Sequence, residues 1–110
     1  MIKVKFWGVR GSIPCPGPRT MKYGGNTACI ELRFPEVNRH IIIDAGSGIR
    51  DLANFMLAND LPKGPISTEI YLSHTHWDHI MGFPFFVPVY IPGTKIKVFG
   101  PVTYEDEPLE

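Results

Sequence analysis

The sequence has few cysteines, no net charge and no long apolar run. Its two cysteines, Cys15 and Cys29, form no C-x-x-C pair, so neither a disulfide scaffold nor a cysteine-ligated metal cluster is expected. No apolar run approaches membrane-spanning length, and the first residues lack the apolar core of a secretory signal. We therefore expect a protein that makes no membrane contact and lies in a reduced, cytoplasmic setting.

Charge and size are those of an ordinary globular protein. Eleven basic and eleven acidic residues cancel, so no overall field attracts nucleic acid or a membrane surface. An apolar content of 44% over 110 residues is enough for one small domain with its own core. No repeat or linker divides the sequence. We expect a single domain over residues 1–110, of which residues 101–110 form a frayed tail.

Hydrophobic patterning predicts five strands. Apolar and polar residues alternate in most of these segments, as in half-buried strands. The run Ile41–Ile43 is β-branched throughout, which predicts a strand buried on both faces. A turn over Pro35–Arg39 should join the second and third strands. The expected strands are Ile2–Trp7, Thr27–Phe34, His40–Ile43, Thr68–Leu72 and Lys95–Phe99.

Helical spacing occurs in the middle of the chain. Gly48–Asn59 is expected to form a helix with Ser47 as its N-cap. A short helix is expected over 78–86, where Pro84 and Pro88 limit its length. Strands followed by helix–strand alternation predict an α+β fold, in which helices cover one face of a sheet. The buried stripe of the longer helix should consist of Ile49, Leu52, Ala53, Met56 and Leu57.

The most informative segment is His74-Thr75-His76-Trp77-Asp78-His79, which places four metal-capable side chains in the pattern H-x-H-x-D-H. In extended backbone, residues two apart share a face, so His74 and His76 can reach one metal ion together. If the chain then turns into a helix, Asp78 and His79 face a second ion. Paired ions in hydrolytic sites lie roughly 3.5–4 Å apart. The segment therefore predicts a site for two divalent metal ions.

Imidazole and carboxylate ligands are those expected of zinc, or of manganese and iron. A metal at this segment would polarise a phosphoryl or carbonyl oxygen and lower the pKa of a bound water, so that hydroxide forms near neutral pH. Such chemistry requires no protein nucleophile, and the sequence shows neither a Ser–His nor a Cys–His arrangement.

Asp44 follows the β-branched strand on a glycine-rich corner. A carboxylate there suits a partner that orients a metal-binding histidine. It also suits a turn or cap residue beside Gly46 and Ser47. The sequence leaves both roles open.

The loops near the N-terminus contain candidate substrate-binding residues. Backbone N–H groups of Gly25 and Asn26 could face an anion, although such a sequence is often only a turn before a strand. Arg10 could place its guanidinium near a phosphate, or extend into solvent as loop arginines commonly do.

With these motifs in place, the chain resembles the metallo-β-lactamase-fold hydrolases. Three further segments resemble the phosphodiesterase-type branch of that superfamily. The segments that carry the superfamily resemblance are Ile41–Gly46 and Ser73–Ile80, and those that resemble the branch are Val9–Ser12, Tyr23–Thr27 and His76–Phe86.

The resemblance implies an αββα sandwich, of which this chain would form the first β-sheet/α half. It implies that His74 and His76 bind one metal ion and that Asp78 and His79 bind the other. Asp78 and Asp44 would be the catalytic carboxylates, with Asp44 supporting the ligands. The implied substrate is a small-molecule or nucleotide phosphodiester. A thioester, lactone or β-lactam hydrolase of the same fold is the alternative.

Family members complete the site with a further His, Asp and His, and no histidine follows His79 here. Each ion would then have two protein ligands, where a catalytic zinc has three, so we expect weak metal binding and slight hydrolysis by this chain alone. Half a sandwich leaves one sheet face uncovered, which predicts self-association or a missing C-terminal half. A non-catalytic metal-binding or oligomerisation module is the alternative from a different functional class.

Overall fold

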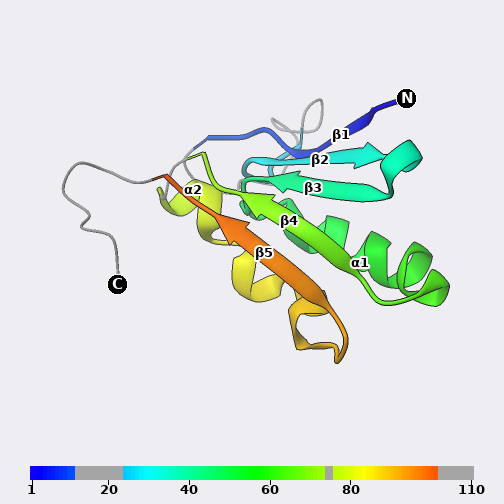
Figure 1. Cartoon of the computed structure of the whole chain (residues 1–110). Helices are drawn as coiled ribbons and strands as arrows, with labels where there is room; N and C mark the ends of the chain where they lie inside the picture. The colour runs from blue at the N-terminus through cyan, green and yellow to red at the C-terminus, as the bar shows by residue number, and fades with distance from the viewer. Residues whose placement is uncertain (12–23, 74–75, 102–110) are drawn as a thin grey trace.

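The computed structural model describes residues 1–11, 24–73 and 76–101. They form one five-stranded sheet, and helices lie against one of its faces (Figure 1). The α-helices among these residues are α1 (Ile49–Asn59), which follows β3, and α2 (Trp77–Ile80), which follows β4. The spatial order of the strands is the chain order, namely β1 (Lys3–Gly8), β2 (Cys29–Phe34), β3 (Arg39–Ile43), β4 (Ser67–Tyr71) and β5 (Lys95–Phe99).

The sheet is mixed, because a short turn joins β2 to β3 as antiparallel strands and a longer crossover joins β3 to β4 as parallel strands. β1, β2 and β3 pair antiparallel, whereas β3, β4 and β5 pair parallel. A short 3-10 turn, η2 (Pro35–Val37), and Asn38 in the left-handed conformation (φ 50°) join β2 to β3. Asparagine adopts this conformation more readily than most residues. The parallel pairing of β3 with β4 requires a crossover, which α1 supplies. The predicted α+β class and the helices on one face are therefore confirmed.

Most predicted boundaries lie within two residues of the observed ones, and the last strand matches throughout. Thr27, predicted to begin the second strand, instead forms an isolated parallel bridge with Arg10. The predicted helix over 78–86 ends after Ile80, and 3-10 turns follow it at the two prolines. These turns are η4 (Phe83–Phe85) and η5 (Val87–Tyr90), and a third, η3 (Leu61–Lys63), follows α1.

Two sequence-based expectations are wrong. Ser47 is not an N-cap: Gly48 holds that position without a side-chain bond, and the Ser47 hydroxyl instead accepts a hydrogen bond from the Thr27 N–H at 2.9 Å. The strand over 41–43 is not buried on both faces. Ile42 is fully buried and its two neighbours are only half-buried, because the helices cover a single face of the sheet.

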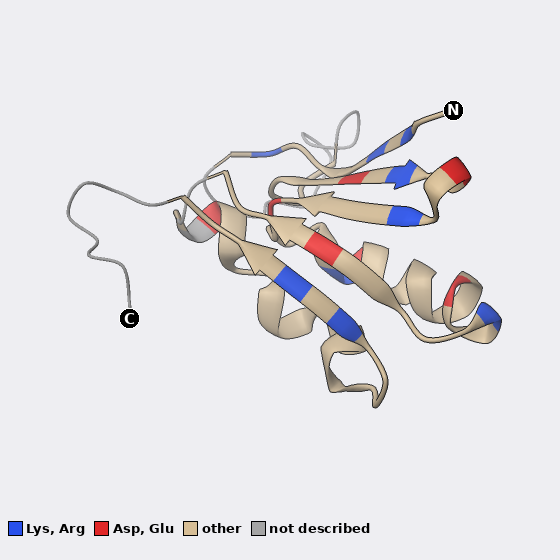
Figure 2. Cartoon of the chain, in the orientation of Figure 1, with Lys and Arg blue, Asp and Glu red and all other residues tan. Residues whose placement is uncertain are grey.

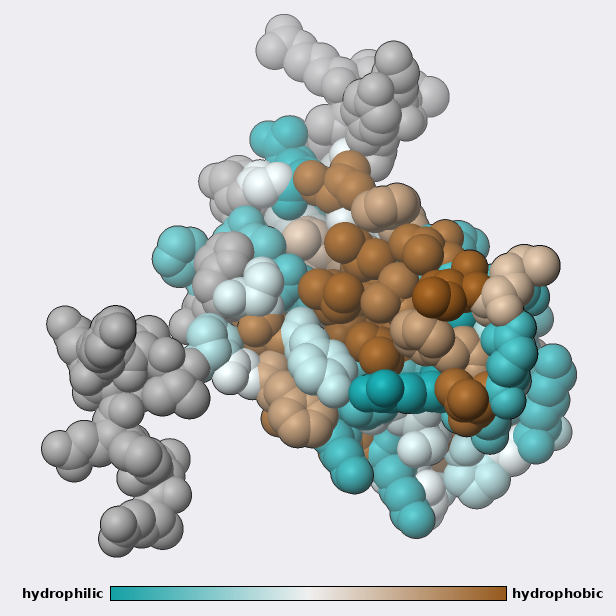
Figure 3. All heavy atoms as spheres, turned by 45° about the horizontal axis from the view of Figure 1, so that its top comes forward, coloured by the Kyte–Doolittle hydropathy of each residue, from teal (hydrophilic) through white to brown (hydrophobic). Residues whose placement is uncertain are grey.

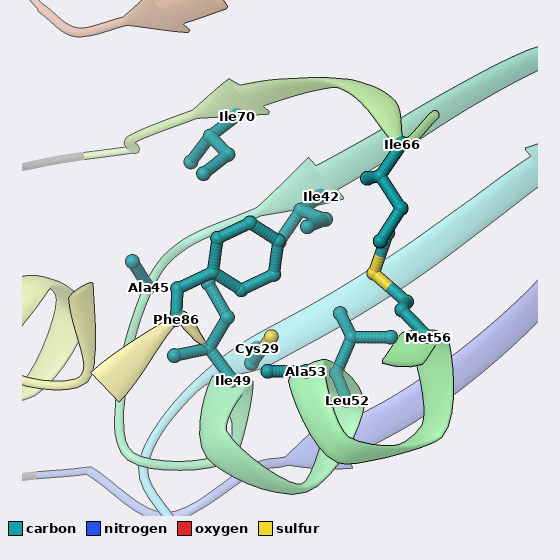
Figure 4. Close-up of a cluster of buried hydrophobic side chains, with 10 residues drawn as sticks. All are labelled: Cys29, Ile42, Ala45, Ile49, Leu52, Ala53, Met56, Ile66, Ile70 and Phe86. Carbon is teal, nitrogen blue, oxygen red and sulfur yellow. The ribbon is translucent and has the colours of Figure 1, made fainter. Parts of the chain in front are cut away.

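The core lies between the sheet and α1 (Figure 4). Four of the five residues of the predicted helical stripe are buried, and Leu57 is half-buried. Burying each side chain of this size stabilises the fold by about 1.5–3 kcal/mol. Cys29 belongs to this core. Burial raises the pKa of its thiol, and the negative charges of Glu31 and Asp44 raise this pKa further. Its thiol therefore packs as a small apolar group, whereas Cys15 lies outside the described residues.

Within the described ranges, no helix combines the length and the apolar composition that crossing a bilayer requires. Of the tail predicted over residues 101–110 the structure describes Pro101, which is exposed and belongs to no strand. The remainder of that predicted tail lies outside the described residues.

Candidate metal centre

Asp44 lies at the carboxyl end of β3, next to the end of β4. Its backbone adopts the left-handed conformation (φ 66°), which Asp tolerates better than most residues. Its N–H donates a hydrogen bond to the Tyr71 carbonyl at 2.8 Å. The parallel pairing of β3 with β4 thus brings Asp44 to the segment that leads into the predicted ligands.

The Asp44 carboxylate is buried and has partners on both oxygens. Oδ1 accepts hydrogen bonds from the Ser73 N–H at 2.7 Å and from the Ser73 hydroxyl at 2.9 Å. Oδ2 lies 2.8 Å from the same hydroxyl and 2.9 Å from Nδ1 of His79. Of the two roles that the sequence leaves open for Asp44, these contacts match the one in which a carboxylate orients a histidine.

The second ring nitrogen of His79 faces another carboxylate. Nε2 of His79 lies 3.2 Å from Oδ2 of Asp78, and both side chains are largely buried. Two ligands of one tetrahedral zinc ion, each about 2.0–2.1 Å from the metal, lie about 3.3 Å apart. The separation and the chemistry of these two donors therefore fit a shared divalent ion.

Backbone contacts hold α2 against the loop after β3. The Ala45 N–H donates to the His79 carbonyl at 2.7 Å, and the Gly82 N–H donates to the Ala45 carbonyl at 2.8 Å. A Cβ at Gly46 would lie 2.6 Å from the Asp78 carbonyl oxygen, and a Cβ at Gly82 would lie 2.1 Å from the Gly46 carbonyl oxygen. Only glycine permits this approach, which fixes Asp78 and His79 relative to Asp44.

The other two predicted ligands are His74 and His76. His76 is exposed, and its carbonyl accepts the His79 N–H at 2.9 Å at the start of the helical turn. His74 lies outside the described residues. In the part of the chain that the structure describes, no three His, Cys, Asp or Glu side chains gather as a metal-binding cluster. Asp44, Asp78 and His79 therefore form two pairwise contacts around one imidazole, and only the Asp78–His79 pair has the separation of two ligands on one ion.

The candidate substrate-binding residues lie together at a neighbouring corner. The Arg10 N–H donates to the Asn26 carbonyl at 3.0 Å, and Gly25 lies half-buried in the same turn. The Asn26 side chain donates to Asp51 at 3.1 Å and accepts from the Ser47 hydroxyl at 3.2 Å. Its amide thus connects the turn to α1, a structural contact that the sequence did not indicate.

Ser73 is the residue of the candidate centre that the sequence did not single out. It donates to the Asp44 carboxylate from both its backbone and its hydroxyl. The available signal was a polar residue at the end of β4, because neighbouring parallel strands place their carboxyl ends at one edge of the sheet.

A second histidine–carboxylate cluster lies elsewhere on the helix-covered face. Glu31 is buried and contacts Nε2 of His40 at 2.7 Å, while Trp7 and Arg33 donate to it at 3.0 and 2.7 Å. Burial acts to raise the pKa of Glu31, but the bonds from His40 and Trp7 and the charge of Arg33 outweigh it and lower the pKa to about 2. Nδ1 of His40 lies 2.6 Å from the Thr68 hydroxyl.

An apolar cavity of about 430 Å³ lies beside α2. Its walls come from the end of β4, from β5 and from the residues that follow His79. They are Ala45, Leu72, Ile80, Met81, Phe83, Pro84 and Val98.

The candidate centre is thus a histidine between two carboxylates at the carboxyl ends of β3 and β4. Its geometry follows from strand register, two close glycine contacts and the Ser73 hydrogen bonds. Comparisons of the chain with protein-family models, with curated proteins and with solved structures found no match.

Proposed function

We propose that this chain carries part of the metal centre of a metal-dependent hydrolase of the metallo-β-lactamase type, acting on phosphodiesters. The observation that carries the proposal is the position of His79, whose Nε2 lies 3.2 Å from Asp78 while Nδ1 lies 2.9 Å from Asp44. Two negative carboxylates beside one imidazole form an arrangement that a divalent cation stabilises.

Asp44 is the positioning residue in this proposal. Ser73 holds its carboxylate through two donors, and that carboxylate lies 2.9 Å from Nδ1 of His79, where a small rotation of the ring would let Nδ1–H donate to it. A histidine oriented in this way presents Nε2 to a metal ion. Asp78 and His79 would hold one ion, and His74 and His76 the other.

When bound, divalent zinc, manganese or iron would polarise the substrate's phosphoryl oxygen and make hydroxide available near neutral pH. Asp78 supplies negative charge to the cation and Asp44 holds the ligand geometry. The loop that contains Gly46 lies between Asp78 and the Ala28 carbonyl, so the turn that includes Asn26 is near this centre. A small-molecule or nucleotide phosphodiester that reaches the ions could therefore contact Arg10, Gly25 and Asn26.

The alternative substrates are thioesters, lactones and β-lactams, because the same metal chemistry serves them. A non-catalytic metal-binding or oligomerisation module is the further alternative, and the small number of protein ligands favours it. Two ligands for each ion predict weak binding, so zinc titration that shows two sub-micromolar sites on a monomer would contradict this ligand set.

The test is hydrolysis of bis-(p-nitrophenyl) phosphate and of a thioester at high protein concentration with Zn²⁺ or Mn²⁺. We expect slow phosphodiester hydrolysis that a chelator abolishes and that Asp78→Asn removes. Glu36→Gln, which removes an exposed carboxylate far from the centre, should leave the rate unchanged. Faster thioester hydrolysis would favour the alternative substrates. A rate that Asp78→Asn does not change would exclude this centre.

A further inference from the structure

A buried threonine lies next to the candidate metal centre. Thr27 lies just before β2, and its side chain is completely buried. The Thr27 hydroxyl and the Asp78 carbonyl oxygen both lie within 2.6 Å of the point that a Cβ of Gly46 would occupy. Thr27 is therefore a close neighbour of the segment that carries Asp78, although the two residues are far apart in the chain.

Thr27 and Ser47 form a reciprocal pair of hydrogen bonds. The Thr27 hydroxyl accepts the Ser47 N–H at 2.7 Å, and the Ser47 hydroxyl accepts the Thr27 N–H at 2.9 Å. Backbone bonds join the same two segments. The Gly46 N–H donates to the Ala28 carbonyl at 2.9 Å, and the Gly48 N–H donates to the Thr27 carbonyl at 3.3 Å. Together these bonds fix the turn that contains Gly46 relative to the start of β2.

The same hydrogen bonds continue to α1. The Ser47 hydroxyl donates to the side-chain carbonyl of Asn26 at 3.2 Å, and the Asn26 amide donates to Asp51 at 3.1 Å. Asp51 lies in the first turn of α1, where the helix dipole favours a negative charge. Hydrogen bonds in a series polarise and strengthen one another. The turn is therefore attached to α1 as well as to β2.

The loop between Asp44 and this turn supports α2. The Ala45 N–H donates to the His79 carbonyl at 2.7 Å, and the Gly82 N–H donates to the Ala45 carbonyl at 2.8 Å. Figure 2 shows the acidic residues of α2 and of the loop after β3 at the same end of the sheet. A displacement of the turn would therefore displace Asp78 and His79 relative to Asp44.

Water does not compete for the hydrogen bonds of Thr27. Its side chain has no exposed surface, whereas the β1 side chains Val4 and Phe6 are 52% and 64% exposed. Figure 3 shows the broad hydrophobic surface that the molecule exposes on one side. If the Thr27 hydroxyl were removed, water could not easily take its place as the acceptor of the Ser47 N–H.

A methyl group in place of this hydroxyl would move the turn. Valine has the shape of threonine, so Thr27→Val would place a methyl group where the hydroxyl now lies 2.7 Å from the Ser47 nitrogen. Non-bonded carbon atoms prefer separations of roughly 3.5–4.0 Å, so the turn would retreat by roughly 1 Å. Thr27→Ser would keep the hydroxyl and remove only a methyl group.

We propose that Thr27 is a positioning residue of the metal centre. Through Ser47 and the turn at Gly46, its hydroxyl sets the position of Asp78 and His79 as ligands of a divalent ion. This inference rests on the proposed function, because the ion belongs to that proposal. Thr27 itself touches neither the ion nor the substrate. Loss of a group that orients metal ligands typically lowers metal affinity roughly 10- to 100-fold.

The test is the Zn²⁺ affinity of three variants, measured by competition with a chromophoric chelator where urea denaturation shows each chain to be folded. Thr27→Val should lower the affinity roughly ten-fold or more, and Thr27→Ser should keep the wild-type value. Thr68→Val is the matched control, because it removes a similarly buried hydroxyl, which contacts His40 in the second histidine–carboxylate cluster. It should lower stability without changing the affinity. Unchanged affinity in Thr27→Val, or an equal loss in Thr68→Val, would overturn the proposal.

Amide hydrogen exchange of the metal-free chain separates this proposal from the proposed function. Thr27→Val should accelerate exchange of the Ala45 and Gly82 N–H groups relative to the amides of β3, whereas Thr27→Ser and Thr68→Val should not. Equal relative exchange in the wild type and in Thr27→Val would show that Thr27 does not position α2. If the wild-type chain binds no zinc but these two amides still respond to Thr27→Val, the proposed function is wrong and the positioning of α2 by Thr27 is supported.

Ser47→Ala answers the same question if Thr27→Val does not fold. It removes the acceptor of the Thr27 N–H and creates no short contact. We expect the same changes in zinc affinity and in the exchange of the Ala45 and Gly82 amides, to a smaller extent. A folded Ser47→Ala variant with wild-type affinity and exchange would overturn the proposal.

Discussion

Two histidines, His40 in β3 and His79 in α2, contact carboxylates, and their surroundings differ. Nε2 of His40 contacts Glu31 and its Nδ1 contacts the Thr68 hydroxyl, while Arg33 balances the charge of Glu31. His79 instead lies between the carboxylates of Asp44 and Asp78. His40 contacts a single carboxylate, in a network that Arg33 extends to Asp60, whereas His79 has a carboxylate at each ring nitrogen.

This difference separates a structural role from a candidate metal-binding role. In the Glu31 cluster, Trp7, Arg33 and His40 all contact one carboxylate, so burial of its charge is compensated. In the cluster of Asp44, Asp78 and His79, which we call the Asp44 cluster, Ser73 donates hydrogen bonds to the Asp44 carboxylate. The Asp78 carboxylate faces Nε2 of His79. We infer that the first cluster stabilises the fold and that the second is arranged for a cation.

The largest expected effect on stability concerns Gly46, because its close backbone contacts hold the Asp44 cluster in place and do not involve the Glu31 cluster. Gly46→Ala would place a Cβ 2.6 Å from the carbonyl oxygens of Ala28 and Asp78. We expect the free energy of unfolding to fall by at least about 3 kcal/mol, because neither backbone segment can move freely. Urea denaturation measures this loss.

Gly100→Ala is the matched control, since a Cβ at Gly100 meets no atom within 4 Å. It should leave the unfolding free energy nearly unchanged. Equal stability of the two variants would show that α2 does not approach the Gly46 loop as described.

The second prediction concerns the buried network. The pKa of Glu31 falls from 4.5 to about 2 on folding, so its ionised form stabilises the protein by roughly 3 kcal/mol above pH 4.5. This contribution should disappear as the pH falls from 4.5 toward 2. Glu31→Gln should therefore lower the unfolding free energy at pH 7, and the difference from wild type should shrink as the pH decreases.

Glu69→Gln removes the same charge from an exposed pair with Arg39. Its effect on the free energy of unfolding should be much smaller, because solvent screens the pair. Urea denaturation over a pH series distinguishes the two variants. Similar losses at pH 7 would contradict the structural role assigned to Glu31.

The third and smallest effect concerns the role of Asp44. Asp44→Asn keeps a side chain that tolerates the left-handed conformation and still accepts a bond from Ser73, but it removes the charge beside His79. We expect Zn²⁺ affinity to fall 10- to 100-fold with little change in stability. Competition with a chromophoric chelator measures the affinity, and Asp51→Asn, in the first turn of α1, should leave it unchanged. An unchanged Zn²⁺ affinity of the Asp44→Asn variant would show that Asp44 does not position a metal ligand.

The sequence predicted the elements that local periodicity determines and missed contacts that depend on tertiary structure. The stripe of α1 and the strand Lys95–Phe99 follow from spacing alone. Ser47 has the composition of an N-cap, but its hydroxyl bonds to the Thr27 segment, twenty residues away in the chain. The Ile41–Ile43 run satisfies the pattern of a strand with two buried faces, yet only packing partners decide whether the second face is covered.

The same limit applies to the candidate centre. Metal-ligand chemistry singled out Asp78 and His79 by their spacing in the H-x-H-x-D-H segment, whereas the sequence left the role of Asp44 open. The contact between Asp44 and His79 depends on the parallel register of β3 and β4, and the Glu31 cluster depends on the antiparallel register of β2 and β3. Register is a property of the whole sheet, so neither contact could be derived from a short motif.

The most direct test of the metal proposal is a Zn²⁺ titration of the wild-type chain, followed through the imidazole NMR signals of all four histidines. We predict that zinc shifts or broadens the signals of His74, His76 and His79 with weak affinity, and that the His40 signal does not respond. Zinc-independent signals from His76 and His79, or an equal response from His40, would contradict the account.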